Sequence, residues 1–575
     1  MHFEGRALGN ERLFLYMKKI MLLVLIFYIA ACQASEKAAA KTSTNIPSKP
    51  NILIIMVDDM GHADLSSFGS EIPTPHLDSL ANKGIKLSQF ITSSVCSPTR
   101  ASLLTGLPPH QVGFGNLAEE LAPNQQGQPG YEGYLSKNAV TIAEVLKDNG
   151  YATMMVGKWH LGKEDDHLPS RRGFSQTFAM LTNASHFSDM KPAYSPTPNA
   201  KAAYTKNGQR LKNLPDNFRY STEFYADELI QQIDNIPKDQ PFFAFLSYSA
   251  PHWPLQAPKA RIEEFMSRYQ EGYDSIAVQR LEKQKQIGLI PHNASLAPRP
   301  PKALKWSDLN QDEQKISSKT MAVYAAMIAE IDTHTGRVIK YLEKQNKLDT
   351  TLILFMSDNG PEGHDLDETW PREHFPDIRR TIDSSHDFSY ENIGLENSYT
   401  FYGAGWAWAS SPAFYAHKGF QSEGGVRTSA FVYGPKFVGP RGISHDFVSV
   451  RDIPATILAV AGIEKPGAVY NGKSNIPMQG RNVLPILNGV QEPQIQVHIE
   501  ETMGKISIRK GNWKLVKMPP PFGNERWNLF NVDKDLSEQT DLSSQHSDKR
   551  DELLKYWQSY QQSYGVILPD WVSGY

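Results

Sequence analysis

The chain has 575 residues, enough for one large domain with a smaller one or for several domains. Its hydrophobic content of 40% and charged content of 21% are those of an ordinary globular protein. The formal net charge of −3 gives no strong preference for nucleic acid or for acidic surfaces, so no nucleic-acid partner is expected.

The N-terminal segment is typical of a targeting signal. Lys18 and Lys19 precede an apolar run at 20–31, which is too short to span a bilayer comfortably. Ile29-Ala30-Ala31-Cys32 resembles the cleavage box of bacterial lipoproteins, in which the cysteine is lipidated and starts the mature chain. The alternative is an ordinary signal peptide that contains an incidental cysteine.

We therefore expect a signal or lipoprotein leader at residues 1–32 and a flexible tether at 33–49. Lipidation of Cys32 would hold the protein at a membrane surface without a transmembrane helix. The expected location is the bacterial periplasm or cell surface. With Cys32 lipidated, Cys96 has no disulfide partner, so the core must stabilise the chain.

Four apolar runs look like buried strands, and each is followed at once by polar side chains. Residues 51–57 precede Asp58 and Asp59, 152–157 precede Lys158 and His160, 242–248 precede His252, and 351–357 precede Asp358 and Asn359. Helical patterns at 142–147 and 321–345 lead into the second and fourth runs.

This alternation predicts an α/β fold with a large, mostly parallel sheet and helices on both faces. Ligands of such sheets bind beyond the carboxyl ends of the strands. The polar side chains that follow the four runs are therefore expected to share one site.

The pattern changes towards the C-terminus. Short strand-like segments at 495–500, 505–510 and 513–517 are separated by turn residues, and a helical stretch follows around 548–560. We expect a catalytic domain at 50–490 and a small α+β subdomain with an antiparallel sheet at 491–575. The weakly patterned segments 185–220 and 360–400 are expected to be loops around the mouth of a pocket.

The acidic residues after the first and fourth runs indicate a metal site. Asp58, Asp59 and Asp358 would repel one another if the fold brought them together, and a bound cation would relieve this. With Asn359 they offer only oxygen ligands, which favours Ca²⁺, or alternatively Mg²⁺, over zinc. An Asp-Asp pair can also simply cap a helix or turn, but the Asp-Asn pair after a second strand weakens that interpretation.

Cys96 lies in Cys96-Ser97-Pro98-Thr99-Arg100, which reads as a loop entering a helix. Because proline is favoured in the first turn of a helix, Pro98 places Cys96 near a helix N-terminus. Free backbone amides and the helix dipole suit an anion and a nucleophile there. These residues alone leave open a thiol nucleophile or a small buried side chain.

The same pentapeptide, continued to Gly106, resembles the signature of type I sulfatases in the alkaline phosphatase superfamily. Gly157-Lys158-Trp159-His160-Leu161-Gly162 is similar to the second signature of that family. The resemblance covers nearly all of the chain from Pro50 onward and looks most like bacterial arylsulfatases. It implies an alkaline-phosphatase-like fold and the activity of a sulfuric ester hydrolase.

The resemblance also implies that a maturation enzyme oxidises Cys96 to formylglycine. One hydroxyl of the hydrated aldehyde attacks sulfur and releases the alcohol, and deprotonation of the second hydroxyl then expels sulfate. Calcium would be held by residue 96 together with Asp58, Asp59, Asp358 and Asn359.

Further roles follow from the resemblance position by position. Arg100 would hold the hydrated aldehyde, and Lys158 and Lys418 would bind the sulfate oxygens. The proton-transfer groups would be Asp358 as base for the attacking hydroxyl, His160 as base for sulfate release, and His252 as acid for the leaving alcohol.

The expected substrate is a small-molecule or carbohydrate sulfate ester. Three alternatives remain: a carbohydrate sulfatase acting on polysaccharide, a phosphonate monoester hydrolase or phosphodiesterase of the same superfamily, and an inactive anion-binding protein. His110, His186 and His417 are further candidates for the pocket. The aromatic residues Trp406, Trp408, Phe414 and Tyr415 would either pack within a loop or form a wall for the leaving group.

Overall fold

The computed structural model describes residues 49–439 and 442–571. The predicted leader, Cys32 and all but the last residue of the predicted tether lie outside this part of the chain. None of the helices in these ranges is long and apolar enough to cross a membrane.

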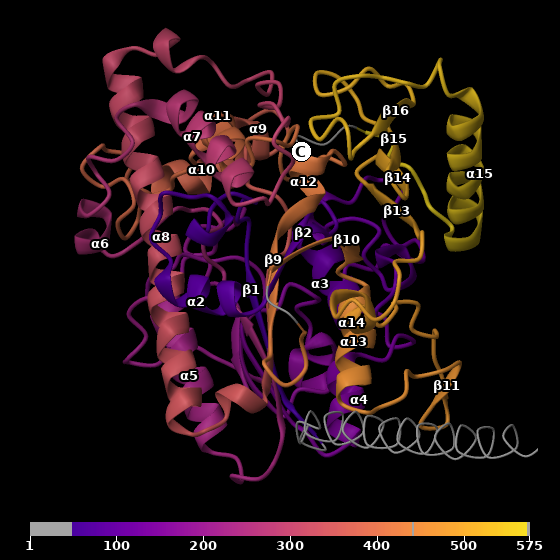
Figure 1. The fold of residues 1–575 in the computed structure, drawn as a ribbon. Coiled ribbons are helices and arrows are strands. Elements are labelled where there is room, and N and C mark those ends of the chain that lie inside the picture. Colours follow the sequence, from indigo (N-terminus) through magenta and orange to yellow (C-terminus); the bar gives the residue numbers. More distant parts are fainter. Residues whose placement is uncertain (1–48, 440–441, 572–575) are drawn as a thin grey trace, which may run out of the picture. The chain divides into compact units, whose positions relative to one another are not determined.

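A large mixed sheet runs through the centre of the chain from Lys49 onward (Figure 1). In sheet order its strands are β10 (Gly442–Ser449), β2 (Ile85–Ile91), β9 (Arg427–Tyr433), β8 (Thr351–Ser357), β1 (Asn51–Val57), β7 (Phe242–Ser247), β3 (Ala152–Lys158), β4 (Gln176–Met180), β5 (Tyr204–Lys206) and β6 (Gln209–Arg210). The five strands from β8 to β4 are parallel to their neighbours, whereas β9, β5 and β6 pair antiparallel.

The four predicted strands are β1, β3, β7 and β8, each within one residue of its expected bounds. They are consecutive in the sheet, in the order β8-β1-β7-β3, so their carboxyl ends meet at one edge. Every residue of β1 is buried, because helices cover both faces of the sheet. Alternate residues of the strand therefore contribute to two separate cores.

On one face the core includes Leu53, Ile55 and Val57 of β1. The helices that pack there are α2 (Pro75–Lys83), α5 (Ser221–Asp234) and α8 (Gln311–Lys344). The other core includes Ile52, Ile54 and Met56, under α3 (Cys96–Thr105), α4 (Ile142–Asp148) and α13 (Asp452–Val460). Figure 1 shows the two sets of helices on opposite sides of the sheet.

Helix α8 begins ten residues before the pattern that predicted it. Its first turn is closed by a capping box, in which the Asn310 side chain accepts from the Glu313 amide and the Glu313 side chain accepts from the Asn310 amide. Most of the residues from Gln311 to Ser317 are exposed and polar, so the apolar periodicity begins only after the helix has started.

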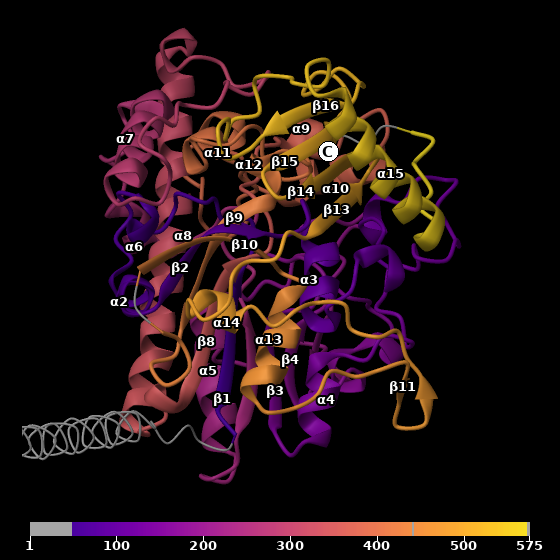
Figure 2. The same ribbon diagram turned by 45° about the vertical axis from the view of Figure 1, so that its right-hand side comes forward.

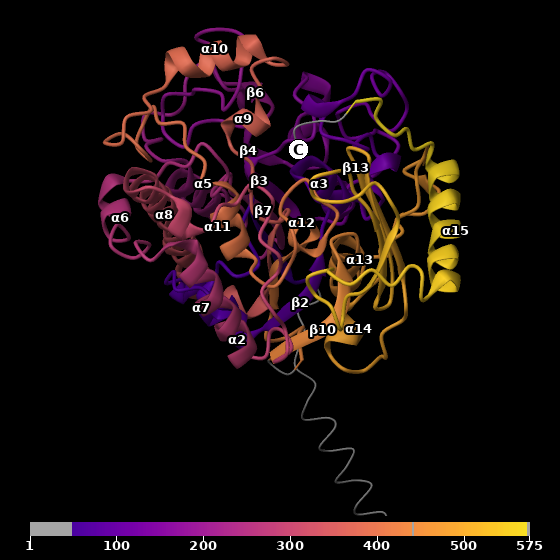
Figure 3. The ribbon, with the colours of Figure 1, turned by 90° about the horizontal axis from the view of Figure 1, so that it is seen from above.

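A small antiparallel sheet follows near the C-terminus, in the order β13 (Val497–Thr502), β14 (Lys505–Lys510), β15 (Trp513–Lys517) and β16 (Asn528–Asn531). The sequence did not indicate β16. Helix α15 (Ser547–Tyr564) covers its outer face, as Figures 2 and 3 show, and shares a core with it through Leu553 and Trp557.

Two contacts join β13 to the segments around α3. The Ser93 hydroxyl donates to Glu500 (2.8 Å), and the His110 ring lies against Glu501 with Nε2 2.9 Å from Oε2. Residues from Lys49 onward form one compact unit, and the domain boundary expected at 490–491 stays a prediction.

Candidate active site

The polar residues at the ends of the four strands converge with Cys96, the first residue of α3. Ligand atoms of Asp58, Asp59, Cys96 and His252 all lie within 4.8 Å of one another. These side chains are buried, with residue exposures of 0% to 3%. The shared site expected at the carboxyl edge of the sheet is therefore present in the structure.

Asp59 lies at the centre of this cluster. Its Oδ1 accepts from the Asn359 amide (2.7 Å) and lies 4.0 Å from the Cys96 Sγ, and its Oδ2 accepts from the Lys418 ammonium (2.8 Å). The Asp59 backbone has φ of 69°, which is uncommon for a residue with a side chain and often marks a functional position.

Each of the three cationic side chains is paired with a carboxylate. Lys158 Nζ lies 2.6 Å from Asp58 Oδ2, and Lys418 is paired with Asp59. Arg100 donates to Asp358 Oδ2 through Nε (3.1 Å) and Nη2 (2.7 Å). Its Nη1 reaches the Lys158 carbonyl (3.0 Å), so the guanidinium joins the ends of β3 and β8.

The pKa values of the acidic side chains in the cluster are shifted by burial and by neighbouring charges. Burial raises the pKa of Asp59 to about 7 against the opposing charge of Lys418, and burial with the Asp58 charge raises that of Asp358 to about 6. Burial would also raise the pKa of Asp58, but Lys158 holds it well below its usual range. Burial raises the pKa of the Cys96 thiol as well, so the thiol is protonated and a poor nucleophile.

Two oxygens of the cluster fit a cation. Asp58 Oδ1 and Asn359 Oδ1 are buried and accept no hydrogen bond within the described residues. Buried acceptors are nearly always satisfied, so such atoms need an explanation, and an ion provides one. With Asp59 and Asp358 they offer only oxygen, which suits Ca²⁺ or Mg²⁺; that an ion binds here, and which ion, stays a prediction.

Glycines allow the loop that bears Lys418 to approach the other loops. The Gly419 amide donates to Ser94 O (2.8 Å), just before Cys96, and the Lys418 amide donates to Pro361 O (3.0 Å). A Cβ on Gly425 would lie 2.0 Å from the Phe420 carbonyl oxygen, which no side chain tolerates.

Glu362 is a site residue that the sequence analysis missed. Its Oε2 lies 3.1 Å from Lys418 Nζ, and its Oε1 contacts His364 Nδ1 (2.7 Å). It forms a buried cluster with His364 and His417 beside the Lys418 loop. Its place four residues after Asp358 was a weak signal, because the intervening sequence has no recognisable pattern.

The predicted acid, His252, faces the cluster with Nε2, which lies 3.5 Å from Asp59 Oδ2. Its Nδ1 contacts the Trp253 carbonyl (2.5 Å), so Nδ1 carries the proton. Burial lowers the pKa of His252 well below its usual range, and Lys418 and Lys158 add to this effect. The imidazole is therefore neutral before an anionic substrate arrives.

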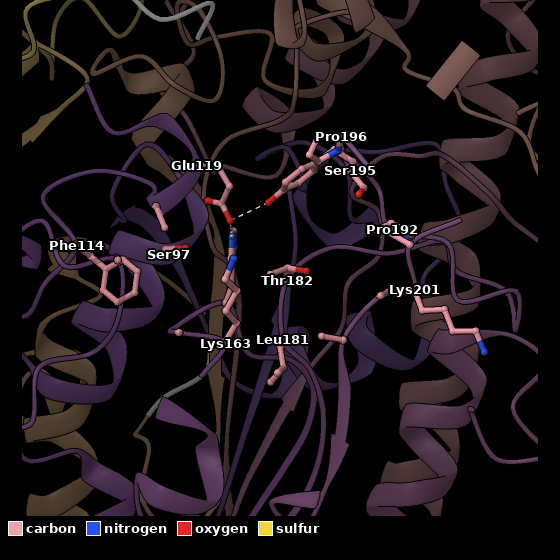
Figure 4. Close-up of a pocket in the computed structure, with 18 residues that line it drawn as sticks. Ser97, Phe114, Glu119, Lys163, Leu181, Thr182, Pro192, Ser195, Pro196 and Lys201 are labelled. Carbon is pink, nitrogen blue, oxygen red and sulfur yellow. Dashed lines mark hydrogen bonds and ion pairs between the residues drawn. The ribbon is translucent and has the colours of Figure 1, made fainter. Parts of the chain in front are cut away.

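The predicted base, His160, lies just after β3, and its backbone has φ of 55°. It borders a cavity of about 420 Å³ that also contacts Ser97, the neighbour of Cys96. Figure 4 shows Ser97, Glu119, Thr182 and Leu181 around this cavity. Residues 192–203 contribute to the wall, as expected of the 185–220 segment.

The 360–400 segment contributes none of the described residues that line this cavity, although its Glu362 lies beside Lys418 in the centre. Further along the segment, the Trp370 ring lies 4.9 Å from that of Tyr194. Bulky apolar side chains of this segment form a cluster with Trp253, against which Tyr194 of the cavity wall also packs. The expected place of this segment at the mouth of a pocket stays a prediction.

The other residues that the sequence suggested for the pocket make packing and hydrogen-bonding contacts within the fold. His110 contacts Glu501 and Tyr560, and His186 Nε2 contacts the His252 carbonyl (3.0 Å) from behind. Trp406 and Trp408 are buried core residues, and the Trp406 ring lies 5.5 Å from those of Tyr269 and Tyr273. The sequence left open whether these aromatic residues pack in a loop or form a wall for the leaving group, and for the two tryptophans packing is confirmed.

Fold and site together define an α/β enzyme with a buried, oxygen-rich cluster that fits a cation. The sulfatase family profile matches residues 50–463. An uncharacterised sulfatase of Schizosaccharomyces pombe is 39% identical over 541 residues, which cover 91% of this chain and 95% of the relative. An arylsulfatase of Klebsiella aerogenes is 37% identical over 434 residues, covering 75% of this chain and 90% of the relative.

Among solved structures, Ps i-CgsB in complex with k-i-k-neocarrahexaose matches with a TM-score of 0.62 and 25% identity, covering 91% of this chain and 95% of that chain. The chain belongs to the sulfatase family, which confirms the resemblance and the expected fold. It is accordingly a sulfuric ester hydrolase.

Proposed function

We propose that the protein hydrolyses sulfate monoesters with a formylglycine derived from Cys96 and a calcium ion. The observation that carries this proposal is the position of Cys96. It begins helix α3, and its sulfur lies 4.0 Å from Asp59 Oδ1 inside the oxygen-rich cluster. The thiol sulfur stands where an oxygen of the modified residue would lie, next to the cation ligands.

The cation would be held by Asp58, Asp59, Asp358 and Asn359, with residue 96 as a further ligand. Once bound, it would polarise the sulfate group and favour an ionised hydroxyl. Charge supports its presence. When all are ionised, the four carboxylates exceed the three cationic side chains by one charge; the groups are Asp58, Asp59, Asp358 and Glu362 against Arg100, Lys158 and Lys418. A divalent ion and a singly charged sulfate ester would together balance this charge.

The cationic side chains of the chain would orient the sulfate. Lys158 approaches the cluster from the end of β3 and Lys418 from a loop. Their ammonium groups would move from carboxylates to sulfate oxygens once a cation neutralises those carboxylates. Arg100 stays bound to Asp358 and Ser247, where it would keep the Asp358 oxygens in place beside residue 96.

Proton transfer would use groups on opposite sides of residue 96. Asp358 would accept the proton of the attacking hydroxyl, and His160 would accept one during sulfate release. His252 would donate to the leaving oxygen through Nε2. The negative charge of a bound sulfate ester would raise the pKa of His252 again and so supply the proton that burial disfavours.

The leaving group would occupy the cavity beside His160. Phe114 and Leu181 give it apolar surface, while Glu119, Thr182 and Tyr194 give it hydrogen-bonding groups. A lining of this kind suits a hydroxylated ring, which favours a carbohydrate sulfate as the natural substrate and an aryl sulfate as a test substrate. The anchor at Cys32 and a location at the bacterial cell surface remain part of the proposal.

The decisive measurement is the mass of the peptide that contains residue 96, taken from protein made in its native host. Formylglycine replaces the thiol with an aldehyde oxygen, and an unmodified thiol in active protein would refute the proposed nucleophile. Turnover of a nitrophenyl sulfate should also exceed that of the matching phosphodiester, and the reverse order would favour the phosphodiesterase alternative.

A further inference from the structure

A half-buried carboxylate faces His160 from the cavity wall. Glu119 belongs to the short turn Ala118–Glu120, and its Oε1 lies 3.3 Å from His160 Nε2. The same oxygen accepts from the Tyr194 hydroxyl (2.8 Å), across the cavity. Figure 4 shows Glu119 among the side chains that surround the cavity.

This contact fixes which ring nitrogen of His160 carries the proton. An ionised carboxylate can only accept hydrogen bonds, so Nε2 must donate to Glu119. Burial would raise the pKa of Glu119, but His160 and Tyr194 hold it below its usual range, so the carboxylate is ionised at neutral pH. A neutral imidazole with a proton on Nε2 has its lone pair on Nδ1.

The other nitrogen has no hydrogen-bond partner. His160 Nδ1 is buried and unpaired within the described residues, and the whole residue is 7% exposed. An unsatisfied buried acceptor costs free energy, so its retention at a left-handed backbone position indicates use in the reaction.

We propose that Glu119 is a positioning residue that holds His160 in the Nε2–H tautomer, so that Nδ1 is the atom that accepts a proton during sulfate release. This rests on the proposed role of His160 as a base. Tyr194 in turn positions Glu119, so the wall that would contact the leaving group also orients the base. A carboxylate that orients an imidazole in this way also stabilises the imidazolium that forms.

The direct test measures the tautomer in the unmodified protein. Nitrogen chemical shifts of ¹⁵N-histidine-labelled protein identify the protonated nitrogen, and the His160 signals are those lost in His160→Gln. We expect Nε2–H in the wild type and a mixture of tautomers in Glu119→Gln, whose amide can also donate. An Nδ1–H form in the wild type, or unchanged signals in Glu119→Gln, would overturn the proposal.

The pH profile provides a second readout on the enzyme. The charges facing His160 are Glu119, Lys158 and Arg100: burial lowers its pKa, Glu119 opposes this, and the two cations add to it. Removing the Glu119 charge should therefore move the acid limb of kcat to lower pH while the plateau falls about tenfold or more. Tyr194→Phe should give a smaller fall with the tautomer retained.

Glu120→Gln is the matched control, because it changes the neighbouring carboxylate in the same turn outside the cavity lining. It should leave the His160 signals and kcat unchanged, and an equal loss in both variants would reduce Glu119 to a structural role. Absence of an aldehyde at residue 96 in active enzyme would refute the proposed function while leaving the tautomer result intact.

Discussion

The ammonium of Lys418 lies 2.8 Å from Asp59 Oδ2, although the two residues are 359 positions apart in the sequence. The same ammonium lies 3.1 Å from Glu362 Oε2, so one buried cation serves two carboxylates. Removing a partner of a buried ion pair leaves an uncompensated charge, which costs more than the pair contributes.

Lys418→Met should therefore lower kcat/KM by about 10²–10³, the usual loss for one oxyanion-stabilising donor. Steady-state kinetics on a nitrophenyl sulfate would measure this effect. Lys514→Met is a matched control, because Lys514 is also buried between two carboxylates, Glu423 (2.8 Å) and Glu538 (2.9 Å), far from the centre in sequence. Lys514→Met should lower the free energy of unfolding, while the folded protein keeps its kcat/KM. Similar losses of kcat/KM in both variants would contradict a sulfate-binding role for Lys418.

Removal of the cation should destabilise the protein as well as inactivate it. Calcium at a hundred times its Kd would add about 2.7 kcal/mol to the free energy of unfolding, and chelation would remove it. Thermal unfolding with and without calcium would show the shift, and Asp58→Asn should weaken it. Asp332→Asn is the control, since Asp332 accepts from two backbone amides of α2 and is not one of the predicted cation ligands; equal shifts in both variants would exclude Asp58 as a ligand.

Cys96→Ala should abolish turnover with little loss of stability. The side chain is small, and its substitution leaves the charged pairs around it intact. Circular dichroism and thermal unfolding would report the fold, and kinetics would report the activity. Loss of the fold would instead favour a packing role for Cys96, and retained turnover would refute its role as the nucleophile precursor.

Glu120 should make stability depend on pH. Burial raises its pKa to about 8, with the Glu119 charge adding, so the folded protein holds this proton over a range in which the unfolded chain has lost it. Because the native state then binds more protons, its contribution is fully present below the unfolded pKa of about 4.3 and is lost as the pH rises towards 8.

Glu120→Gln removes this titration. We expect it to raise the free energy of unfolding near pH 8 by a few kcal/mol and to change it little near pH 4.5. Denaturant unfolding at the two pH values would measure the difference. A variant whose stability changed equally at both values would show that the effect comes from packing rather than from the proton.

The buried strands were predictable because each is apolar on both faces. Residues 51–57 and 351–357 contain almost no polar side chains, which a parallel strand between two helical layers requires. Strand β9 was not predicted: it pairs antiparallel with both β2 and β8, and nothing local in 427–433 specifies that direction. The same holds for β16, whose four residues give too short a pattern.

The centre could be predicted where side chains follow directly from a strand, as with Asp58 and Asp358. Glu119 and Glu362 could not, because each stands in an irregular segment and reaches its partner only through the tertiary fold. The capping box at Asn310 and Glu313 was readable in the sequence, yet the polar turns after it concealed the start of α8.

The contact between Ser93 and Glu500 has a consequence for the order of events during synthesis. During synthesis, all the residues proposed for the active site have been added to the chain once Lys418 has been made. Strand β13 is made about eighty residues later. Until then, the segment just before Cys96 lacks the strand that it hydrogen-bonds. In the finished fold Cys96 is 2% exposed, so an enzyme that carried out the proposed oxidation would have to reach it before the fold is complete. If Cys96 is oxidised as proposed, we therefore expect the modification to precede completion of the C-terminal sheet.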